Sequence, residues 1–217
     1  MTPPRIKICC IRTVEEANLA VACGASALGL VSAMPSGPGV IDEDTISDII
    51  RYVPPAIATF LLTSLQNADA IVDQQRRCRP NTLQLVDSFA ETELIRLRHA
   101  LPGIALVQVI HVGGQESIIE ACAVAPLVDA ILLDSGNQKL GTKELGGTGR
   151  THDWAISREI RERCSKPVYL AGGLRAENVR TAIDQVQPFG LDICNGVRTA
   201  GDLDESKLRA FILAARQ

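Results

Sequence analysis

The feature that most constrains the fold of this chain is a regular alternation of short apolar segments with amphipathic ones. Eight strand-like segments each precede a segment of helical periodicity, at a repeat of roughly 25 residues. This alternation predicts a closed α/β barrel of the (β/α)8 type, in which every helix returns the chain to the next parallel strand. The expected strands are 5–11, 27–32, 56–63, 82–86, 104–112, 130–134, 167–171 and 191–194, and the expected helices are 13–24, 42–50, 67–72, 89–99, 115–124, 153–164, 177–186 and 205–215.

An open, doubly wound sheet is the alternative fold for such a pattern. Its dinucleotide-binding fingerprint would place glycines directly after the first strand. The sequence has Cys9-Cys10-Ile11-Arg12-Thr13 there, which favours the barrel. Aromatic residues make up only 3% of the chain and hydrophobic residues 46%, so aliphatic side chains must fill the interior, as in buried parallel sheets. No linker divides the sequence, and we expect one domain over residues 1–217.

Charge and cysteine content limit the kinds of partner. The formal net charge is −3, which gives no electrostatic footprint for nucleic acid, so we expect a small-molecule partner. The seven cysteines are scattered and no secretory leader precedes them, which predicts a reduced, cytoplasmic protein. The apolar segments are far shorter than the ~20 residues of a membrane helix, so no membrane association is expected.

Three of the expected strands end in residues that suit chemistry on a phosphorylated substrate. In a parallel barrel these ends meet at one face, where the active site forms and the last loops often hold a phosphate. Asp134 ends an apolar strand, and burial there would raise its pKa and make it a general acid. The other reading of Asp134 is a turn-forming residue ahead of Ser135-Gly136.

Glycines in the following loops allow a phosphate to approach the backbone closely. The candidate residues are Gly147, Gly149, Gly172, Gly173, Asn195 and Gly196. Any one pair would ordinarily be a tight turn, but three such loops together favour an anion site. Cys9 ends the first strand, where it is either a small buried hydrophobe or, if ionised, a general base.

These motifs resemble those of the phosphoribosylanthranilate isomerase family, which acts in tryptophan biosynthesis. The resemblance runs in order along the chain, and its most specific parts are the second and third of the motifs below. The matching segments are Lys7-Ile8-Cys9 with Leu132-Leu133-Asp134, Gly146-Gly147-Thr148-Gly149 with Asp153-Trp154, Leu170-Ala171-Gly172-Gly173-Leu174 with Glu177-Asn178-Val179, and Asp192 ahead of Asn195-Gly196-Val197.

The resemblance implies an isomerase that performs an Amadori rearrangement of N-(5-phosphoribosyl)anthranilate to its 1-deoxyribulose 5-phosphate isomer. Asp134 would protonate the ring oxygen, and Cys9 would remove the proton from C2′. Asp192 would contact polar groups of the substrate, and the glycine loops would hold its phosphate. The resemblance implies neither a metal nor an organic cofactor, and members occur as monomers or homodimers.

Several positions depart from the family pattern. The second loop of the family carries Ser-x-Arg, whose Arg holds the anthranilate carboxylate, whereas this chain has Ser36-Gly37-Pro38-Gly39-Val40. A glycine does not replace a bidentate guanidinium. Cys10 replaces the glycine after the cysteine, and Arg198 replaces a glutamate. Arg12 is a candidate to hold the carboxylate instead, and Arg198 is a second.

Three hypotheses remain. The first is a phosphoribosylanthranilate isomerase, and the second is a relative that isomerises a different phosphosugar. The third is a non-catalytic phosphometabolite-binding barrel, which the retained Cys9 and Asp134 disfavour. The loop 135–145 has the length and glycine content of an active-site lid.

Overall fold

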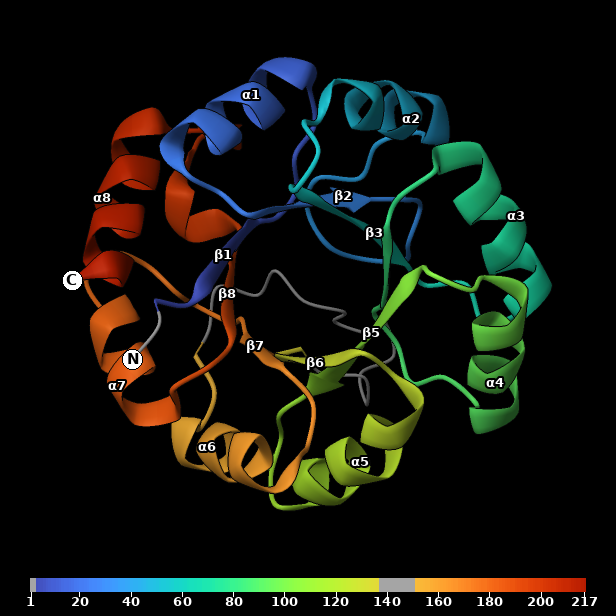
Figure 1. Cartoon of the computed structure of the whole chain (residues 1–217). Coiled ribbons are helices and arrows are strands. Elements are labelled where there is room, and N and C mark those ends of the chain that lie inside the picture. Colours follow the sequence, from blue (N-terminus) through green and yellow to red (C-terminus); the bar gives the residue numbers. More distant parts are fainter. Residues whose placement is uncertain (1–2, 137–150) are drawn as a thin grey trace.

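The computed structural model describes residues 3–136 and 151–217 and confirms the predicted (β/α)8 barrel. Eight parallel strands close on themselves in chain order, and the helices surround them (Figure 1). The strands are β1 (Arg5–Ile8), β2 (Ala27–Val31), β3 (Ala58–Thr63), β4 (Thr82–Leu85), β5 (Ala105–His111), β6 (Ala130–Asp134), β7 (Val168–Leu170) and β8 (Gly190–Ile193). The helices are α1 (Val14–Cys23), α2 (Glu43–Tyr52), α3 (Ala68–Cys78), α4 (Glu91–Ala100), α5 (Glu116–Val124), α6 (Trp154–Arg163), α7 (Val179–Val186) and α8 (Glu205–Arg216).

Local sequence signals set the ends of the helices. At the start of α1 the Thr13 side chain accepts a hydrogen bond from the Glu16 amide, at 3.2 Å, as the cap spacing predicted. Gly24 ends α1 with a left-handed φ of 107°, a conformation that favours glycine. Side chains of Asp42, Asn67 and Asp153 cap α2, α3 and α6 in the same way.

Successive side chains of each strand point alternately out of and into the barrel, which gives two apolar cores. Ile6 and Ile8 of β1 point outward and join the larger core between the sheet and the helices. Lys7 and Cys9, two residues further along, point into the barrel, where Phe60 and Tyr169 pack edge to face at 5.7 Å between ring centroids. These side chains therefore fill part of the barrel interior.

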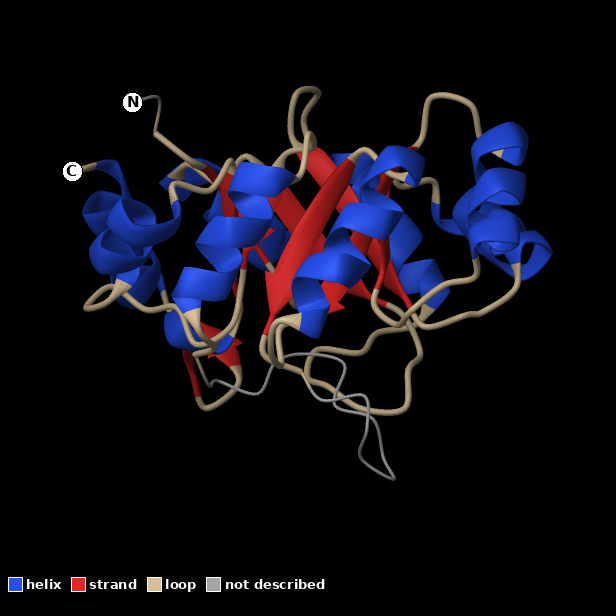
Figure 2. Cartoon of the chain, turned by 90° about the horizontal axis from the view of Figure 1, so that it is seen from below, coloured by secondary structure: helices blue, strands red, loops and turns tan. Residues whose placement is uncertain are grey.

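The loops that follow the strands gather at a single face of the molecule. Figure 2 shows the strands running toward this lower side, where a small antiparallel hairpin of β9 (Arg198–Thr199) and β10 (Asp202–Leu203) also lies. Short 3-10 turns, η1 (Ala125–Leu127) and η2 (Asn195–Val197), complete the described elements. Within residues 3–136 and 151–217, no helix has both the length and the apolar character needed to cross a bilayer.

Candidate active site

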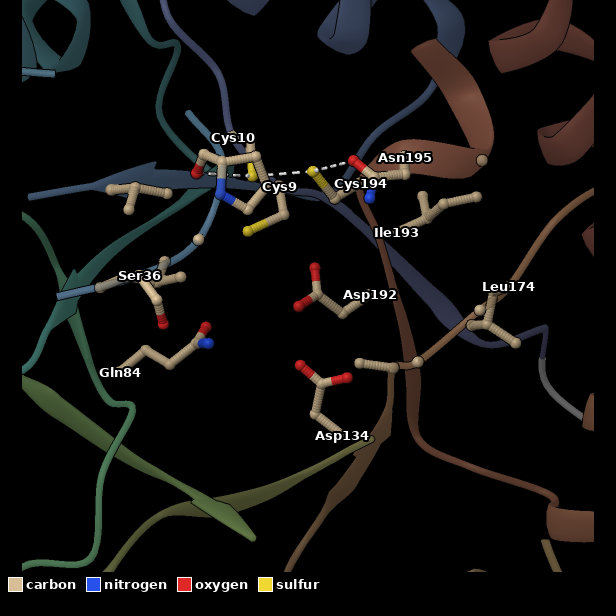
Figure 3. A pocket seen from close by; sticks show the side chains of 18 of the residues that line it. Cys9, Cys10, Ser36, Gln84, Asp134, Leu174, Asp192, Ile193, Cys194 and Asn195 are labelled. Atoms are coloured by element: carbon tan, nitrogen blue, oxygen red, sulfur yellow. Dashed lines mark hydrogen bonds between the residues drawn. The ribbon is translucent and has the colours of Figure 1, made fainter. Parts of the chain in front are cut away.

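A cavity of about 260 Å³ opens at the C-terminal ends of the strands. Figure 3 shows the side chains of Cys9, Asp134 and Asp192 pointing into it from three different strand ends. The structure thus brings together seven of the residues that the sequence singled out. These are Cys9, Asp134, Gly172, Gly173, Asp192, Asn195 and Gly196.

Cys9 lies just beyond β1 and is held there by backbone contacts. Its amide donates to the Ile193 carbonyl at 2.8 Å, which extends the pairing of β1 with β8 by one residue. Gly29 on β2 faces it, and a Cβ there would lie only 2.8 Å from the Cys9 Sγ. The absence of a side chain at Gly29 therefore makes the space that the thiol occupies.

The surroundings of Cys9 favour its thiolate. A hydrogen bond with the Cys10 thiol lowers the pKa of Cys9, burial opposes this, and the positive charge of Lys7 lowers the pKa further. The net result is a pKa below the ordinary value for cysteine. A thiolate is the form of cysteine that can remove a proton, so the site favours a base at this position.

A buried ion pair supports the wall beside Cys9. The Lys7 ammonium is fully buried, contacts the Asp192 carboxylate at 2.8 Å and lies 5.2 Å from the Phe60 ring centroid. Burial alone would lower the pKa of Lys7, but the attraction of Asp192 and of Cys9 outweighs it and raises the pKa. Lys7 therefore stays charged and supplies a fixed positive charge below the cavity.

Asp134 ends β6 and faces the cavity from the opposite side. Burial raises the pKa of Asp134 above the ordinary value, although the Ser135 amide donates a hydrogen bond to its carboxylate at 2.7 Å and lowers the pKa in part. A carboxyl group with a raised pKa carries its proton closer to neutral pH. Its environment therefore suits a general acid, as expected from its place at the end of an apolar strand.

The loops after β7 and β8 form the glycine-rich rim of the cavity. Gly172 and Gly173 have left-handed φ values of 82° and 62°, which bring the backbone rather than side chains to the surface. The two loops pack tightly, because a Cβ at Gly196 would collide with the Leu174 carbonyl. The rim therefore exposes backbone to the cavity, and Arg175 lines it as well.

Two arginines that were candidates to hold a carboxylate lie elsewhere. Arg12 is absent from the cavity lining and pairs with Asp202 at 2.6 Å and Glu16 at 3.6 Å. Arg198 is buried, pairs with Glu16 at 2.8 Å and donates to the carbonyls of Cys9 and Cys10 at 3.3 and 2.5 Å. Arg198 therefore holds the backbone that carries Cys9.

Some predicted site residues lie outside the part of the chain that the structure describes, and some lining residues were not predicted. Gly147 and Gly149, and most of the proposed lid at 135–145, lie outside the described residues. The sequence reasoning missed Arg175, Gln84 and Cys194 as lining residues. The available signal was that Arg175 and Cys194 follow strands β7 and β8, and that Gln84 is a polar residue near the end of β4. Among the side chains that the structure describes, no group of three or more His, Cys, Asp or Glu is arranged to hold a metal ion.

The fold and this cavity define a class: a (β/α)8-barrel protein whose cavity, at the C-terminal ends of its strands, is lined by Cys9, Asp134 and a glycine-rich rim. Comparison with known proteins is more specific. Residues 6–214 match the family model of N-(5'phosphoribosyl)anthranilate (PRA) isomerase. The chain therefore belongs to the PRA isomerase family.

Individual relatives agree with this assignment. N-(5'-phosphoribosyl)anthranilate isomerase 2 of Methanosarcina mazei is 37% identical, over 98% of this chain and 94% of the relative. The crystal structure of phosphoribosyl anthranilate isomerase from Thermotoga maritima superimposes with a TM-score of 0.83 at 28% identity, covering 98% of both chains. A structure of the same enzyme type in complex with reduced 1-(o-carboxyphenylamino)-1-deoxyribulose 5-phosphate gives a TM-score of 0.80 at 27% identity, again over 98% of both chains.

Proposed function

We propose that this chain catalyses the Amadori rearrangement of N-(5-phosphoribosyl)anthranilate to 1-(2-carboxyphenylamino)-1-deoxyribulose 5-phosphate, a step of tryptophan biosynthesis. The observation that carries the proposal is the placement of Cys9 and Asp134 around one cavity with a glycine-rich rim. Their pKa values are shifted in the directions that a base and an acid need. The membership of the chain in the PRA isomerase family supports the same reaction.

In the proposed mechanism, Asp134 donates its proton to the furanose ring oxygen as the C1′–O bond breaks. The nitrogen lone pair forms a C=N bond, and the open chain becomes a protonated Schiff base. Cys9 then removes the proton from C2′, and the electron pair of that bond forms the enolamine, which tautomerises to the ketone. The substrate nitrogen accepts the electrons, so the proposed reaction uses no metal or organic cofactor.

The binding roles follow from position around the cavity. We propose that the phosphate binds at Gly172, Gly173, Asn195 and Gly196, with Gly147 and Gly149 as further predicted contacts. Asp192 would accept hydrogen bonds from substrate hydroxyl groups while its contact with Lys7 holds the carboxylate in place. Because Arg12 is paired outside the cavity, we assign it no substrate contact. We also expect a cytoplasmic enzyme that is a monomer or a homodimer.

A second candidate function rests on the charge of the cavity wall. Arg175, on the glycine-rich rim, is the single cation in the described lining, and the opposite wall around Ser36 and Gln84 carries no charged side chain. A carboxylate there would lack the ion pair that normally favours it. The same acid and base would then isomerise a phosphoribosyl amine with an uncharged group in place of anthranilate.

The proposed function is tested by supplying the chain to a strain that lacks the isomerase, on medium without tryptophan. We expect growth with the wild type and none with Cys9→Ala or Asp134→Asn. The matched controls are Cys122→Ala, a cysteine on α5, and Asp73→Asn, an exposed aspartate on α3 that pairs with Arg76. Both controls should grow, and growth with Asp134→Asn would contradict the proposed acid.

A direct comparison of two substrates separates the candidate functions. The purified chain is assayed with N-(5-phosphoribosyl)anthranilate and with N-(5-phosphoribosyl)aniline, which lacks the carboxylate. A higher kcat/KM for the anthranilate supports the first function, and a higher value for the aniline supports the second. No turnover of either by a folded protein would contradict both and favour a binding protein.

A further inference from the structure

Two cysteines that transfer no proton in the proposed mechanism lie against each other beside Cys9. The Cys194 Sγ lies 2.8 Å from the Cys10 Sγ, across the ends of β8 and β1 (Figure 3). This separation is shorter than ordinary contact between sulfur atoms and approaches the ~2.05 Å of a disulfide bond. Because the two sulfur atoms are already so close, formation of a disulfide bond between Cys10 and Cys194 needs little movement of either loop.

The backbone fixes the Cys10 side of this contact. Cys10 has a left-handed φ of 63°, which is unusual for a residue other than glycine. Arg198 donates to its carbonyl at 2.5 Å, and a Cβ on Gly39 would lie 2.5 Å from the Cys10 Cβ. These contacts hold Cys10 in an unfavourable backbone conformation that directs its thiol toward Cys194. Residues with strained backbones of this kind cluster at functional sites.

We propose that Cys10 and Cys194 form a redox-active dithiol that a hydroperoxide oxidises to a disulfide next to Cys9. Cys194 is partly exposed, whereas Cys10 is buried at 5% exposure, so the oxidant reaches Cys194 first. Disulfides in reducing compartments are usually transient and redox-sensing, which fits a pair at an active site.

The proposed oxidation takes place in two balanced steps. The Cys194 thiolate attacks the O–O bond of the peroxide, forms a sulfenic acid and releases hydroxide, which takes up a proton as water. The sulfur of Cys10 then attacks the Cys194 sulfur, the S–O bond breaks, and the proton of Cys10 leaves with the hydroxyl group as a second water. Two thiols and one hydroperoxide thus give one disulfide and two hydroxyl products.

Oxidation would act on Cys9 through a lost hydrogen bond. The Cys10 thiol is the largest influence that lowers the pKa of Cys9, and a disulfide sulfur has no hydrogen to donate. The charge of Lys7 would then offset the burial of Cys9 less completely, so the pKa of Cys9 would rise and its thiolate fraction would fall. The effect on turnover rests on the proposed function, in which Cys9 is the base. Formation of the disulfide does not depend on that function.

The first test is peptide mapping of the reduced protein after exposure to hydrogen peroxide. Trypsin cuts after lysine and arginine, so we expect a disulfide-linked pair of peptides, 8–12 with 181–198. The link should disappear in Cys194→Ser and in Cys10→Gly, a replacement that suits the left-handed backbone. It should persist in Cys122→Ser, the matched control, because Cys122 and Cys164 form a separate pair 3.7 Å apart.

The second test measures the reactivity of Cys9 without any substrate. At neutral pH, alkylation of Cys9 by iodoacetamide should slow about tenfold after peroxide treatment, since a hydrogen bond to a charged group is lost, and dithiothreitol should restore it. The proposal is overturned if the link survives in Cys10→Gly, which would assign it to Cys9. It is also overturned if peroxide leaves only an oxidised Cys9, or if alkylation is unchanged once the link has formed. Turnover that fails in the reduced protein would instead count against the proposed function.

Discussion

The buried pair of Lys7 and Asp192 gives the most quantitative prediction. Their charged atoms are 2.8 Å apart, and at an effective dielectric constant of about 20 the attraction is about 6 kcal/mol. Removal of both ions from water costs several kcal/mol for each, so most of this attraction is offset. The pair therefore stabilises the fold little in net terms, but loss of one partner leaves a buried, uncompensated charge.

Lys7→Met should lower the free energy of unfolding by about 3–5 kcal/mol. The double variant Lys7→Met/Asp192→Asn should be more stable than Lys7→Met, because it removes the stranded carboxylate. Urea unfolding followed by circular dichroism measures all members of the cycle. The exposed pair of Arg51 and Asp48, at 3.2 Å, provides the matched control, and Arg51→Met should change the free energy by less than about 1 kcal/mol.

The reasoning is refuted if the free energy of unfolding of Lys7→Met lies within about 1 kcal/mol of the wild-type value. It is equally refuted if the effects of the two substitutions add without coupling, since residues in contact should couple by at least about 0.5 kcal/mol. Either result would mean that water reaches the pair, or that the two side chains do not stabilise each other in the fold.

Three further predictions concern the surroundings of the site. Gly29→Ala should push the Cys9 thiol aside, because the new Cβ would lie 2.8 Å from it, and kcat should fall about 100-fold. Gly113→Ala is the matched control and should change little, because its Cβ would lie in ordinary contact with Glu116, at 3.7 Å. Burial lowers the pKa of His152 from 6.5 to about 4, so it stays neutral in the fold while the unfolded chain gains a proton. Stability should therefore fall by about 3 kcal/mol as the pH drops from 6.5 to 4, and urea unfolding of His152→Gln should lack this loss. Arg198→Lys keeps the charge but loses the hydrogen bonds to the carbonyls of Cys9 and Cys10, and steady-state kinetics should show kcat reduced about tenfold at constant KM.

Much of the fold was predictable because it depends on local patterns. Alternating apolar segments predicted all eight barrel strands, and the cap signals predicted the ends of α1. The boundaries were less accurate. The first strand was expected to reach Ile11 but ends at Ile8, because the left-handed backbone at Cys10 breaks the extended conformation. The third was expected from Ala56, whose φ of 75° delays its start to Ala58.

Long-range partners were beyond the reach of the sequence patterns. The inward-facing position of Lys7 follows from alternation, but its partner lies 185 residues away. Arg12 was proposed to bind substrate, yet Asp202, 190 residues away, contacts it on the hairpin β9–β10. That hairpin was missed, since strands of two residues have no measurable periodicity. The common cavity of Cys9 and Asp134 was anticipated because it depends only on strand ends meeting at one face of a barrel.

The most direct test of the proposed acid and base is the kcat/KM of the wild type, Cys9→Ser and Asp134→Asn with N-(5-phosphoribosyl)anthranilate. General acid–base catalysis contributes about 10²–10⁴-fold, so each substitution should lower kcat/KM by that factor. Affinity for the product should stay within about threefold, since neither residue is assigned to the phosphate site. A folded Asp134→Asn or Cys9→Ser variant that turns over within about tenfold of the wild type would contradict the account.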